Sequence, residues 1–392
     1  MNTYNRFNIT FKKGKGCWLW DKNGKKYLDA VSGIATCSLG HSDRVLRKNL
    51  STQLRRIQHI SNLYNIEEQE LLSKLLTNNS CAESVFFCNS GAEAIESAIK
   101  LIKKHGNNKD NSKESLILAA ESSFHGRTIG ALSATGQPKY QSGFEPLLSG
   151  FRFFKYNKID SIKRIFSESV QNNQIISGII IEPIQGEGGV IPGEKDFFRE
   201  LRKLCDKNDT LLILDEVQSG VGRTGKMWGY ENLGIEPDAF TLAKGLGGGH
   251  AIGALLVNKK ANIFSPGDHA STFGGNPFAC RAAITVLEEI KRRNLLENVI
   301  SRGNQIEEGL SHMASDFPHI IKGRRGIGLL QGIVLQENTI DLKSFTSKAF
   351  DNGLLVVAAG RNVIRIVPPL TISRSETEKL LKKLYSIFKD FC

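Results

Sequence analysis

Residues 210–218 read TLLILDEVQ, and residues 241–250 read TLAKGLGGGH. In the first stretch, Asp215 ends a short apolar run of the kind that forms a buried strand. In the second, Lys244 follows another apolar stretch and precedes glycines, which leave room around its side chain. The two residues are 29 positions apart, about one strand-plus-helix unit. Because the carboxyl ends of parallel strands meet at one edge of a sheet, we expect Asp215 and Lys244 to lie together there.

Short apolar runs of the same kind recur through the middle of the chain, with helical patterns between them. They are Ser84–Cys88, Ser115–Ala119, Ser177–Ile181, Thr210–Leu214 and Ala251–Val257. Strand–helix alternation predicts an α/β fold, with a mainly parallel central sheet and helices on both of its faces. We expect this large domain to span residues 55–285.

The character of the sequence changes after about residue 280. A long helical pattern at 283–317 leads to strands near 326–335 and 363–367 and then to a final helix. Residues 17–29 (CWLWDKNGKKYLD) predict a hairpin, because aromatic and apolar residues flank a turn signal. We expect residues 286–392 to form a smaller α+β domain, completed by the N-terminal segment 1–54.

The composition is that of an ordinary globular chain and argues against several classes of protein. Seven cysteines without a C-x-x-C pair fit neither a disulfide framework nor a zinc site, so we expect reduced thiols, no metal and a cytoplasmic location. No apolar run is long enough for a membrane span, and the N-terminus has no secretory pattern. The net charge of +12 is dispersed, which indicates a solvated basic surface and no nucleic-acid partner.

The residues after the strand at 84–88 predict a capped helix. They read NSGAEAIESAIKLIKKHG, with apolar residues at helical spacing. Ser90 and Glu93 form a capping-box pattern, and Gly106 is expected to end the helix. By itself this pattern suits an ordinary capped helix. The N–H groups at Gly91 and Ala92 would also form an anion site suited to a phosphate.

Asp215, Gln218 and Lys244 have the chemistry expected around a cationic ring. A carboxylate at the end of a buried strand needs a partner, and a protonated pyridine nitrogen is one, although capping of a turn is an alternative. Gln218 is placed to donate to a phenolate oxygen on such a ring. Partial burial favours a neutral, nucleophilic Lys244, whereas most lysines lie on the surface. The pair of Asp215 and Lys244 is more specific than either residue.

Six motifs occur in order along nearly the whole chain: NSGAEA, FHGRT, EPIQGEGG, LDEVQSGVGRTG, AKGLGGG and STFGGNP. This set resembles the class III, fold-type-I pyridoxal-phosphate aminotransferases. The resemblance implies the fold-type-I architecture, pyridoxal 5'-phosphate as cofactor, and a homodimer with active sites at its interface. Within the family, TGQPKYQSGFEPL (135–147) and YLDAVSGIATCSLGH (27–41) are most similar to members that use N2-acetyl-L-ornithine.

The resemblance assigns cofactor contacts residue by residue. Lys244 is expected to bind the cofactor covalently and, as the catalytic base, to move a proton between substrate and cofactor carbons. Phe124 of FHGRT is expected to stack on the ring, with core packing as the alternative. Thr272 is expected to reach the phosphate bound by the neighbouring subunit. The other expected contacts are Ser90, Gly91 and Ala92 at the phosphate, and Asp215, Val217 and Gln218 around the ring.

Two arginines are expected to bind substrate carboxylates, because a guanidinium pairs with a carboxylate through two hydrogen bonds. By resemblance, Arg127 binds the α-carboxylate of acetylornithine, and Arg365 binds a carboxylate of glutamate or 2-oxoglutarate. Glu187 is expected to cover Arg365 in the first half-reaction and to release it in the second. A surface ion pair is the alternative for both arginines, and it is weaker for Arg365, which interrupts an apolar strand.

Five other positions bear on substrate choice. Ile34 stands where ornithine aminotransferases have a tyrosine that helps to hold free ornithine, which favours an acylated substrate or an ω-amino acid. Ser271 is expected close to the substrate, and Glu182 on the wall of the same pocket. HASTFGG replaces the commoner HGSTYGG, so that Ala270 and Phe273 stand where glycine and tyrosine are usual.

The resemblance implies transfer of the 5-amino group of N2-acetyl-L-ornithine to 2-oxoglutarate, a step of arginine biosynthesis that gives N-acetyl-L-glutamate 5-semialdehyde and L-glutamate. The alternative amino donors are 4-aminobutyrate, ornithine and succinyl-diaminopimelate. A glutamate-1-semialdehyde mutase would usually have Met in place of Gln218 and would lack QGEGG. A non-enzymatic descendant would be expected to have lost Lys244 or Asp215, and both are present.

Overall fold

A seven-stranded sheet forms the centre of the computed structural model, which describes all 392 residues. Its strands are β4 (Ser84–Cys88), β5 (Glu114–Ala120), β6 (Phe151–Phe154), β7 (Gln174–Ile181), β10 (Leu211–Asp215), β11 (Ala239–Leu242) and β12 (Gly253–Val257). Their order is β4-β12-β11-β10-β7-β5-β6. The pairings are parallel except those of β12, which runs antiparallel to both neighbours. The predicted α/β fold with a mainly parallel sheet is confirmed.

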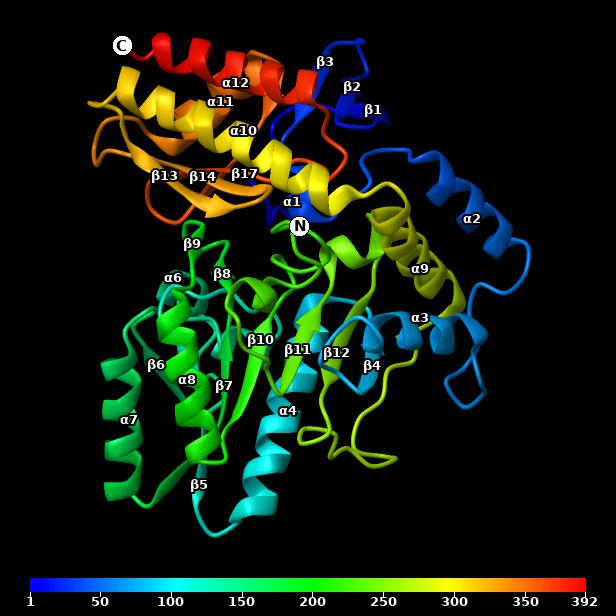
Figure 1. Cartoon of the computed structure of the whole chain (residues 1–392), viewed down its shortest axis with the longest axis vertical. Helices are drawn as coiled ribbons and strands as arrows, with labels where there is room; N and C mark the ends of the chain where they lie inside the picture. The colour runs from blue at the N-terminus through cyan, green and yellow to red at the C-terminus, as the bar shows by residue number, and fades with distance from the viewer.

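Helices cover both faces of this sheet. α4 (Gly91–Lys109) lies on one face, and α7 (Ile159–Gln171) and α8 (Lys195–Lys207) lie on the other (Figure 1). Crossover connections between parallel strands are right-handed. The chain moves along the sheet in one direction from β4 to β5 and in the opposite direction from β6 to β10, so the connecting helices lie on both faces. Five of the seven strands coincide with strands predicted from the sequence; the four-residue strands β6 and β11 were not predicted.

Helix α4 differs from its prediction at both ends. Ser90 caps it as expected, since its hydroxyl accepts the N–H of Glu93 at 3.2 Å. The Glu93 carboxylate, however, accepts the N–H of Asn89, one residue before the cap, so the capping box is incomplete. The predicted end at Gly106 is wrong, because the helix continues past it. Gly106 serves packing instead: a Cβ there would lie 2.3 Å from the hydroxyl of Ser177 on β7.

We expect Gly106→Ala to lower the free energy of unfolding by about 1 kcal/mol or more, although alanine is the better helix former. The added methyl group would also lie 2.5 Å from the hydroxyl of Ser115, and two neighbouring strands would have to shift. The urea midpoint measures the change. Asn107→Ala, an exposed position on the same helix, is the matched control and should be neutral or slightly stabilising. Equal midpoints for the two variants would contradict the packing argument.

The two ends of the chain combine in a second part, above the central sheet in Figure 1. The predicted hairpin is present as β2 (Trp18–Asp21) and β3 (Lys26–Asp29), and β1 (Phe11–Lys15) pairs with β2. β15 (Leu354–Leu355) pairs in parallel with β3, so main-chain hydrogen bonds join the N-terminal segment to the C-terminal residues. The domain boundaries at 54 and 285 stay a prediction.

The remaining C-terminal strands form a four-stranded antiparallel sheet. They are β13 (Ile321–Ile327), β14 (Leu330–Leu335), β17 (Val363–Ile366) and β16 (Val357–Ala359), in that spatial order. The helices of this part are α10 (Leu295–Asp316), α11 (Leu342–Asp351) and α12 (Arg374–Lys389). The single helical pattern predicted at 283–317 is divided, because Asn294 adopts a left-handed conformation between α9 (Pro277–Arg292) and α10. Two further helices, α2 (Arg44–Leu54) and α3 (Glu67–Thr77), pack against α9.

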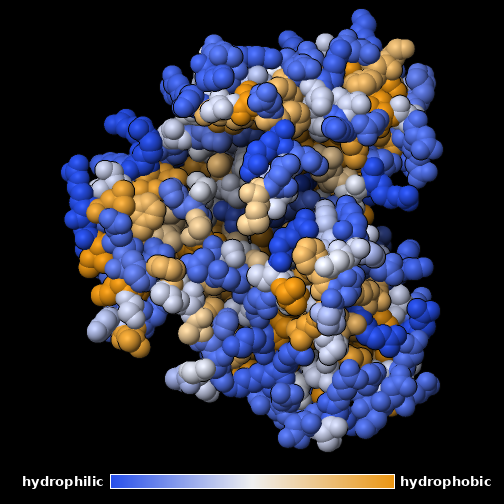
Figure 2. All heavy atoms as spheres, turned by 180° about the vertical axis from the view of Figure 1, so that it is seen from behind, coloured by the Kyte–Doolittle hydropathy of each residue, from blue (hydrophilic) through white to orange (hydrophobic).

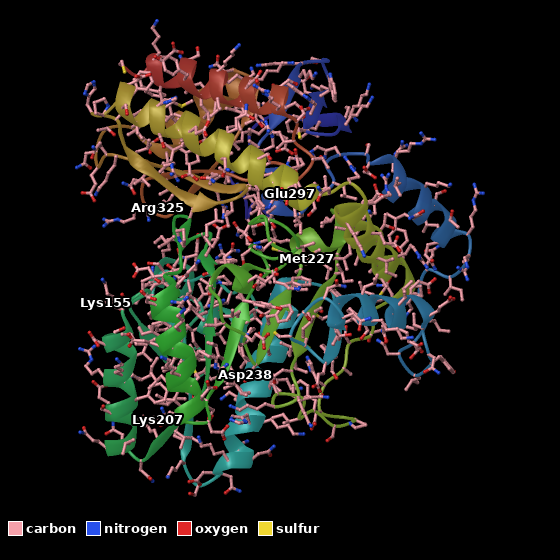
Figure 3. The ribbon with its side chains drawn as sticks, in the orientation of Figure 1. Lys155, Lys207, Met227, Asp238, Glu297 and Arg325 are labelled. Carbon is pink, nitrogen blue, oxygen red and sulfur yellow. The ribbon has the colours of Figure 1, made fainter.

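The loop after β10 connects the central sheet to the second part. The main-chain oxygen of Arg223 accepts the N–H of Leu329 at 3.0 Å, next to the β13–β14 turn. Figure 3 labels Met227 of this loop and Glu297 of α10 where the two parts meet, and Asp238 just before β11, toward the other end of the strands. No helix is both long and apolar enough to cross a membrane. All seven cysteines are free, and no group of side chains is arranged to hold a metal ion.

Candidate active site

A cavity of about 520 Å³ lies at the carboxyl ends of β10 and β11. Asp215 is the last residue of β10, Lys244 follows β11 closely, and both line the cavity. The register of these strands pairs Asp215 with Thr241, which brings the two ends to the same edge of the sheet. Ten of the residues singled out from the sequence line this cavity: Ser90, Gly91, Ala92, Phe124, Arg127, Glu182, Asp215, Val217, Gln218 and Lys244.

The N-terminus of α4 forms one end of the cavity, where Ser90, Gly91 and Ala92 lie. Its N–H groups and the dipole of a helix of 19 residues favour an anion there. Gly91 lies so close to Val217 that a Cβ on the glycine would approach the valine side chain to 2.9 Å. A side chain at residue 91 would therefore fill the space between the helix end and the cavity wall.

Asp215 lies at another wall of the cavity with both carboxylate oxygens engaged. Oδ1 accepts the N–H of Val217 at 3.1 Å and the hydroxyl of Thr241 at 3.2 Å, and Oδ2 lies 2.7 Å from Nδ1 of His125. Burial opposes a charge on His125, but the hydrogen bond and negative charge of Asp215, with Glu182 nearby, outweigh it and raise the pKa of the imidazole. Asp215 is thereby held as an oriented carboxylate.

His125 is a site residue that the sequence analysis missed. It lies directly after Phe124 in FHGRT, and this position in the motif is the only feature of the sequence that could have indicated a role in the site. Its ring is fully buried, and Nε2 has no partner within the chain. A buried ring nitrogen without a hydrogen bond is costly, which is consistent with a position beside a ligand or a water molecule.

Lys244 begins the short 3₁₀ helix η2 (Lys244–Gly247) and adopts a left-handed conformation, with φ at 35°. Burial lowers the pKa of its amine, and the positive charge of Arg365 lowers it further, while three carboxylates (Glu187, Asp215 and Glu182) act in the opposite direction. A lowered pKa increases the fraction of neutral amine, which is the form that acts as nucleophile and base.

Glu182 holds the Phe124 segment against the wall of the cavity. Its carboxylate accepts the N–H of Phe124 and the N–H of Gly186, each at 3.1 Å. Burial raises the pKa of this carboxyl to about 7; the charge of Asp215 also raises it, while His125 and the two hydrogen bonds lower it. Glu182 therefore fixes the position of Phe124 and titrates near neutral pH.

Arg365 lies on β17 with a side chain that is only 1% exposed. Its Nη1 donates to Glu187 at 2.7 Å and to the side-chain oxygen of Gln218 at 2.9 Å, whereas its Nε has no partner. Glu187 is half-exposed, so the pair has one buried and one accessible member. Because Gln218 uses its oxygen for Arg365, its NH₂ group remains available as a donor in the cavity wall.

Arg127 lies exposed in the cavity wall and makes no hydrogen bond or ion pair within the chain. Its guanidinium carbon lies 4.0 Å from the ring centroid of Tyr140 and 5.5 Å from that of Phe124. All of its N–H donors are therefore free for a ligand carboxylate.

Five of the residues predicted to contact ligands lie outside the lining of this cavity: Ile34, Glu187, Ser271, Thr272 and Arg365. Ser271 and Thr272 line a second cavity of about 600 Å³. The Ser271 hydroxyl is nevertheless joined to the first cavity, because it accepts the side-chain N–H of Asn89, a lining residue, at 3.2 Å. Thr272 is exposed, and its contact with a neighbouring subunit stays a prediction.

Ile34 belongs to the short turn α1 (Ser32–Ala35), whose residues all have positive φ. Its side chain is exposed, and Thr36 is the residue of this segment that lines the cavity. A β-branched residue at positive φ is strained, and such strain is concentrated at functional sites. Asp29 supports the turn, because its Oδ1 accepts the N–H of Ser32 at 2.8 Å and its Oδ2 lies 2.7 Å from Nε2 of His41.

Ala270 and Phe273, which stand where the family usually has glycine and tyrosine, lie near the second cavity, the one lined by Ser271 and Thr272. Ala270 lines it. Phe273 is 61% exposed and packs its ring against His59, with centroids 5.1 Å apart. Neither residue lines the cavity that contains Lys244.

The first cavity has the donor set that a phosphorylated pyridine aldehyde requires. The helix N-terminus provides an anion site, Asp215 provides an oriented carboxylate for a protonated ring nitrogen, and Lys244 provides a buried amine for the aldehyde. Phe124 and Val217 provide apolar contacts for a ring. The cavity therefore fits pyridoxal 5'-phosphate, which when bound supplies a cationic ring that takes up the electrons released at the substrate carbon.

Comparison with known proteins agrees with this chemistry. Residues 1–388 match the family described as aminotransferase class-III. The chain belongs to the class-III aminotransferases, which depend on pyridoxal phosphate.

Its relatives within this class include cyanobacterial and structurally characterised enzymes. An acetylornithine aminotransferase of Prochlorococcus marinus subsp. pastoris is 73% identical over 390 residues, which cover 100% of this chain and 94% of the relative. The acetylornithine aminotransferase of Synechocystis sp. is 48% identical over 98% of this chain and 90% of its own. The structure of the Toxoplasma gondii ornithine aminotransferase superposes with a TM-score of 0.94 at 28% identity, covering 100% of this chain and 92% of that one. The N-acetylornithine aminotransferase structure from Stenotrophomonas maltophilia gives 0.85 at 32% identity, covering 99% and 97%.

Proposed function

We propose that this aminotransferase transfers the 5-amino group of N2-acetyl-L-ornithine to 2-oxoglutarate, in arginine biosynthesis. The observation that carries the proposal is that two arginines of the site differ in exposure and in pairing with an acid. Arg127 is exposed and free of any acid, whereas Arg365 is buried and covered by Glu187 at 2.7 Å. The name shared by relatives of 73% and 48% identity supports the same substrate.

In this proposal Lys244 is the catalytic residue. Its neutral amine would accept the proton from the substrate carbon that bears the amine, and the resulting ammonium would be the proton donor later in the same half-reaction. With the cofactor bound, Asp215 would stabilise a positive charge on its ring, and the NH₂ group of Gln218 would be available to donate to it. Ser90, Gly91 and Ala92 bind the phosphate, and Phe124 and Val217 pack against the ring.

Arg365 and Glu187 allow one cavity to accept two differently shaped substrates. Acetylornithine has its carboxylate far from the reacting amine and needs Arg127, while a second free cation near the ring would attract the wrong end of the molecule. Glu187 neutralises that cation at 2.7 Å. Glutamate has a carboxylate beside its reacting amine, and it takes the place of Glu187 on Arg365. Glu187 is accessible and can move away, which suits this exchange.

The test is a set of half-reactions on the purified enzyme without 2-oxoglutarate. Acetylornithine, ornithine, 4-aminobutyrate and succinyl-diaminopimelate are added separately, and absorbance follows the cofactor from its aldehyde to its amine form. We expect acetylornithine to react with the highest kcat/KM. A faster reaction with 4-aminobutyrate or ornithine would overturn the proposed substrate while leaving the aminotransferase class unaffected.

Replacing Glu187 with alanine is expected to shift the enzyme from acetylornithine toward glutamate. Arg365 then stays uncovered, so the ratio of kcat/KM for glutamate to that for acetylornithine should rise by about 10- to 100-fold, the range expected for one hydrogen bond to a charged group. Half-reaction kinetics with each donor measure the ratio. Glu194→Ala, an exposed glutamate with no ion pair to Arg365, is the matched control. An unchanged ratio in Glu187→Ala would contradict the covering role.

The homodimer and the cytoplasmic location also belong to the proposal, which includes no nucleic-acid or membrane partner. Thr272 is exposed and lines the second cavity and not the one that contains Lys244, which suits a contact to a partner's phosphate. Figure 2 shows apolar surface on the side that carries α2 and α3. The exposed large apolar residues of this region are Leu54, Ile57, Leu63, Tyr64 and Leu71. A patch of this kind is typical of a subunit interface, and seven free cysteines are consistent with the cytoplasm.

A further inference from the structure

The segment TGQPKYQ (residues 135–141) is fastened to the loop that carries Phe124 and Arg127. The buried Gln137 donates its side-chain amide to the main-chain oxygen of Ser123 at 3.0 Å. Gly136 donates its N–H to the Ser123 hydroxyl at 2.9 Å, and Gln141 donates to the oxygen of Thr135 at 2.9 Å. These bonds fix the short helix α6 (Pro138–Gln141) relative to Phe124.

Tyr140 of this helix contacts two residues of the FHGRT motif, Phe124 and Arg127. Its ring meets the edge of Phe124, with centroids 5.8 Å apart and planes at 82°. The guanidinium of Arg127 lies over the same ring at 4.0 Å. The Tyr140 hydroxyl makes no hydrogen bond, so the ring alone makes these contacts.

We infer that Tyr140 is a positioning and specificity-determining residue, whose ring holds Arg127 ready for the α-carboxylate of the amino donor. The inference rests on the proposed function. An exposed arginine on a flexible stem would otherwise lose rotamer freedom when it binds a carboxylate. Contact with a ring face orients the guanidinium without using its N–H donors, which remain free for a bidentate carboxylate.

Lys139 is the competing candidate for this part of the site. It is exposed, and its amine lies 4.7 Å from the centroid of the Tyr140 ring. If Lys139 bound the carboxylate, Tyr140 would act through the lysine and Arg127 would be dispensable. Arg127 lines the cavity and Lys139 does not, and this favours the arginine.

The test compares Tyr140→Leu, Tyr140→Phe and Lys139→Met in the holoenzyme, with two readouts. Calorimetry gives the Kd of N-acetyl-L-norvaline, which has the carboxylate and chain of acetylornithine but no amine to react. Half-reactions give kcat and KM for acetylornithine and, separately, for glutamate, one of whose two carboxylates the proposed function assigns to Arg365. Tyr140→Met serves as a second truncating variant if the leucine protein does not fold.

For Tyr140→Leu we expect the Kd of N-acetyl-L-norvaline and the KM of acetylornithine to rise roughly 3- to 30-fold, the range of one cation–π contact. The KM of glutamate should rise less than that of acetylornithine, because Arg365 binds one of the two carboxylates of glutamate. Tyr140→Phe should restore the wild-type values, because it keeps the ring, and Lys139→Met should resemble the wild type. In an Arg127→Met background, Tyr140→Leu should have no further effect on the Kd.

Three results would overturn the inference. Equal losses with acetylornithine and glutamate would assign Tyr140 to the support of Phe124 alone. A larger loss in Lys139→Met than in Tyr140→Leu would assign the carboxylate to the lysine. An unchanged Kd in Tyr140→Leu would make the ring contact incidental. Failure of the proposed function is distinguished from all three, because the wild-type enzyme itself would then fail to bind N-acetyl-L-norvaline and to react with acetylornithine.

Discussion

Lys244→Ala is expected to lower kcat by about 10³-fold or more with either amino donor. Lys244 is the only lysine that lines the cavity, so no second amine can take over its role. It is also buried beside Arg365, and these surroundings lower its pKa and keep the amine available as a base. Stopped-flow half-reactions measure the proton-transfer step directly, and mass spectrometry after borohydride reduction shows whether the cofactor is covalently attached.

The control for this variant is Lys155→Ala, an exposed lysine labelled in Figure 3. It should retain wild-type turnover and the covalent link. Lys244→Ala should retain the fold, because alanine is smaller than lysine and fits in the same place. The substitution also removes an amine whose charged form is unfavourable when buried. Turnover in Lys244→Ala above about one tenth of wild type would refute the catalytic assignment.

The sequence predicted the part of the site that depends on the ends of strands. Asp215 and Lys244 were recognisable because Asp215 ends one apolar run and Lys244 follows another, and because their spacing of 29 residues is about one strand-plus-helix unit. The helix N-terminus at Gly91 was recognisable for a similar reason, since a strand precedes it and Ser90 caps it. The periodicity of apolar residues and their position along the chain are enough to predict such features.

The parts that the sequence did not predict depend on contacts between distant segments. His125 reaches Asp215 across 90 positions of the chain, and nothing in the spacing of FHGRT indicates that contact. A helix end was predicted at Gly106 because glycine commonly ends helices. The structure shows instead that a side chain at this position would collide with Ser177 on a neighbouring strand. Tyr140 lies against Arg127 where the side chain of Gln137 fastens the segment of Tyr140 to the main chain of Ser123, and the sequence does not indicate that contact.

Replacing Asp215 with asparagine is expected to lower kcat by about 10²- to 10³-fold, with a smaller loss in cofactor affinity. Asparagine has nearly the same shape and keeps one oxygen, which can still accept from Val217 and Thr241. It has no negative charge, so the protonated ring nitrogen of the cofactor loses its partner. The loss should be similar for both amino donors, because the ring takes part in each half-reaction.

A second readout of Asp215→Asn does not depend on turnover. The hydrogen bond and charge of Asp215 help to raise the pKa of His125, so the variant should lower that pKa. NMR titration of His125 in wild type and variant measures the change. Thr241→Val is the matched control, because it removes one neutral hydrogen bond to Asp215 and leaves the charge in place. It should cost about tenfold or less in kcat. If Thr241→Val and Asp215→Asn lost equal activity, orientation of the carboxylate and not its charge would be the property that catalysis requires.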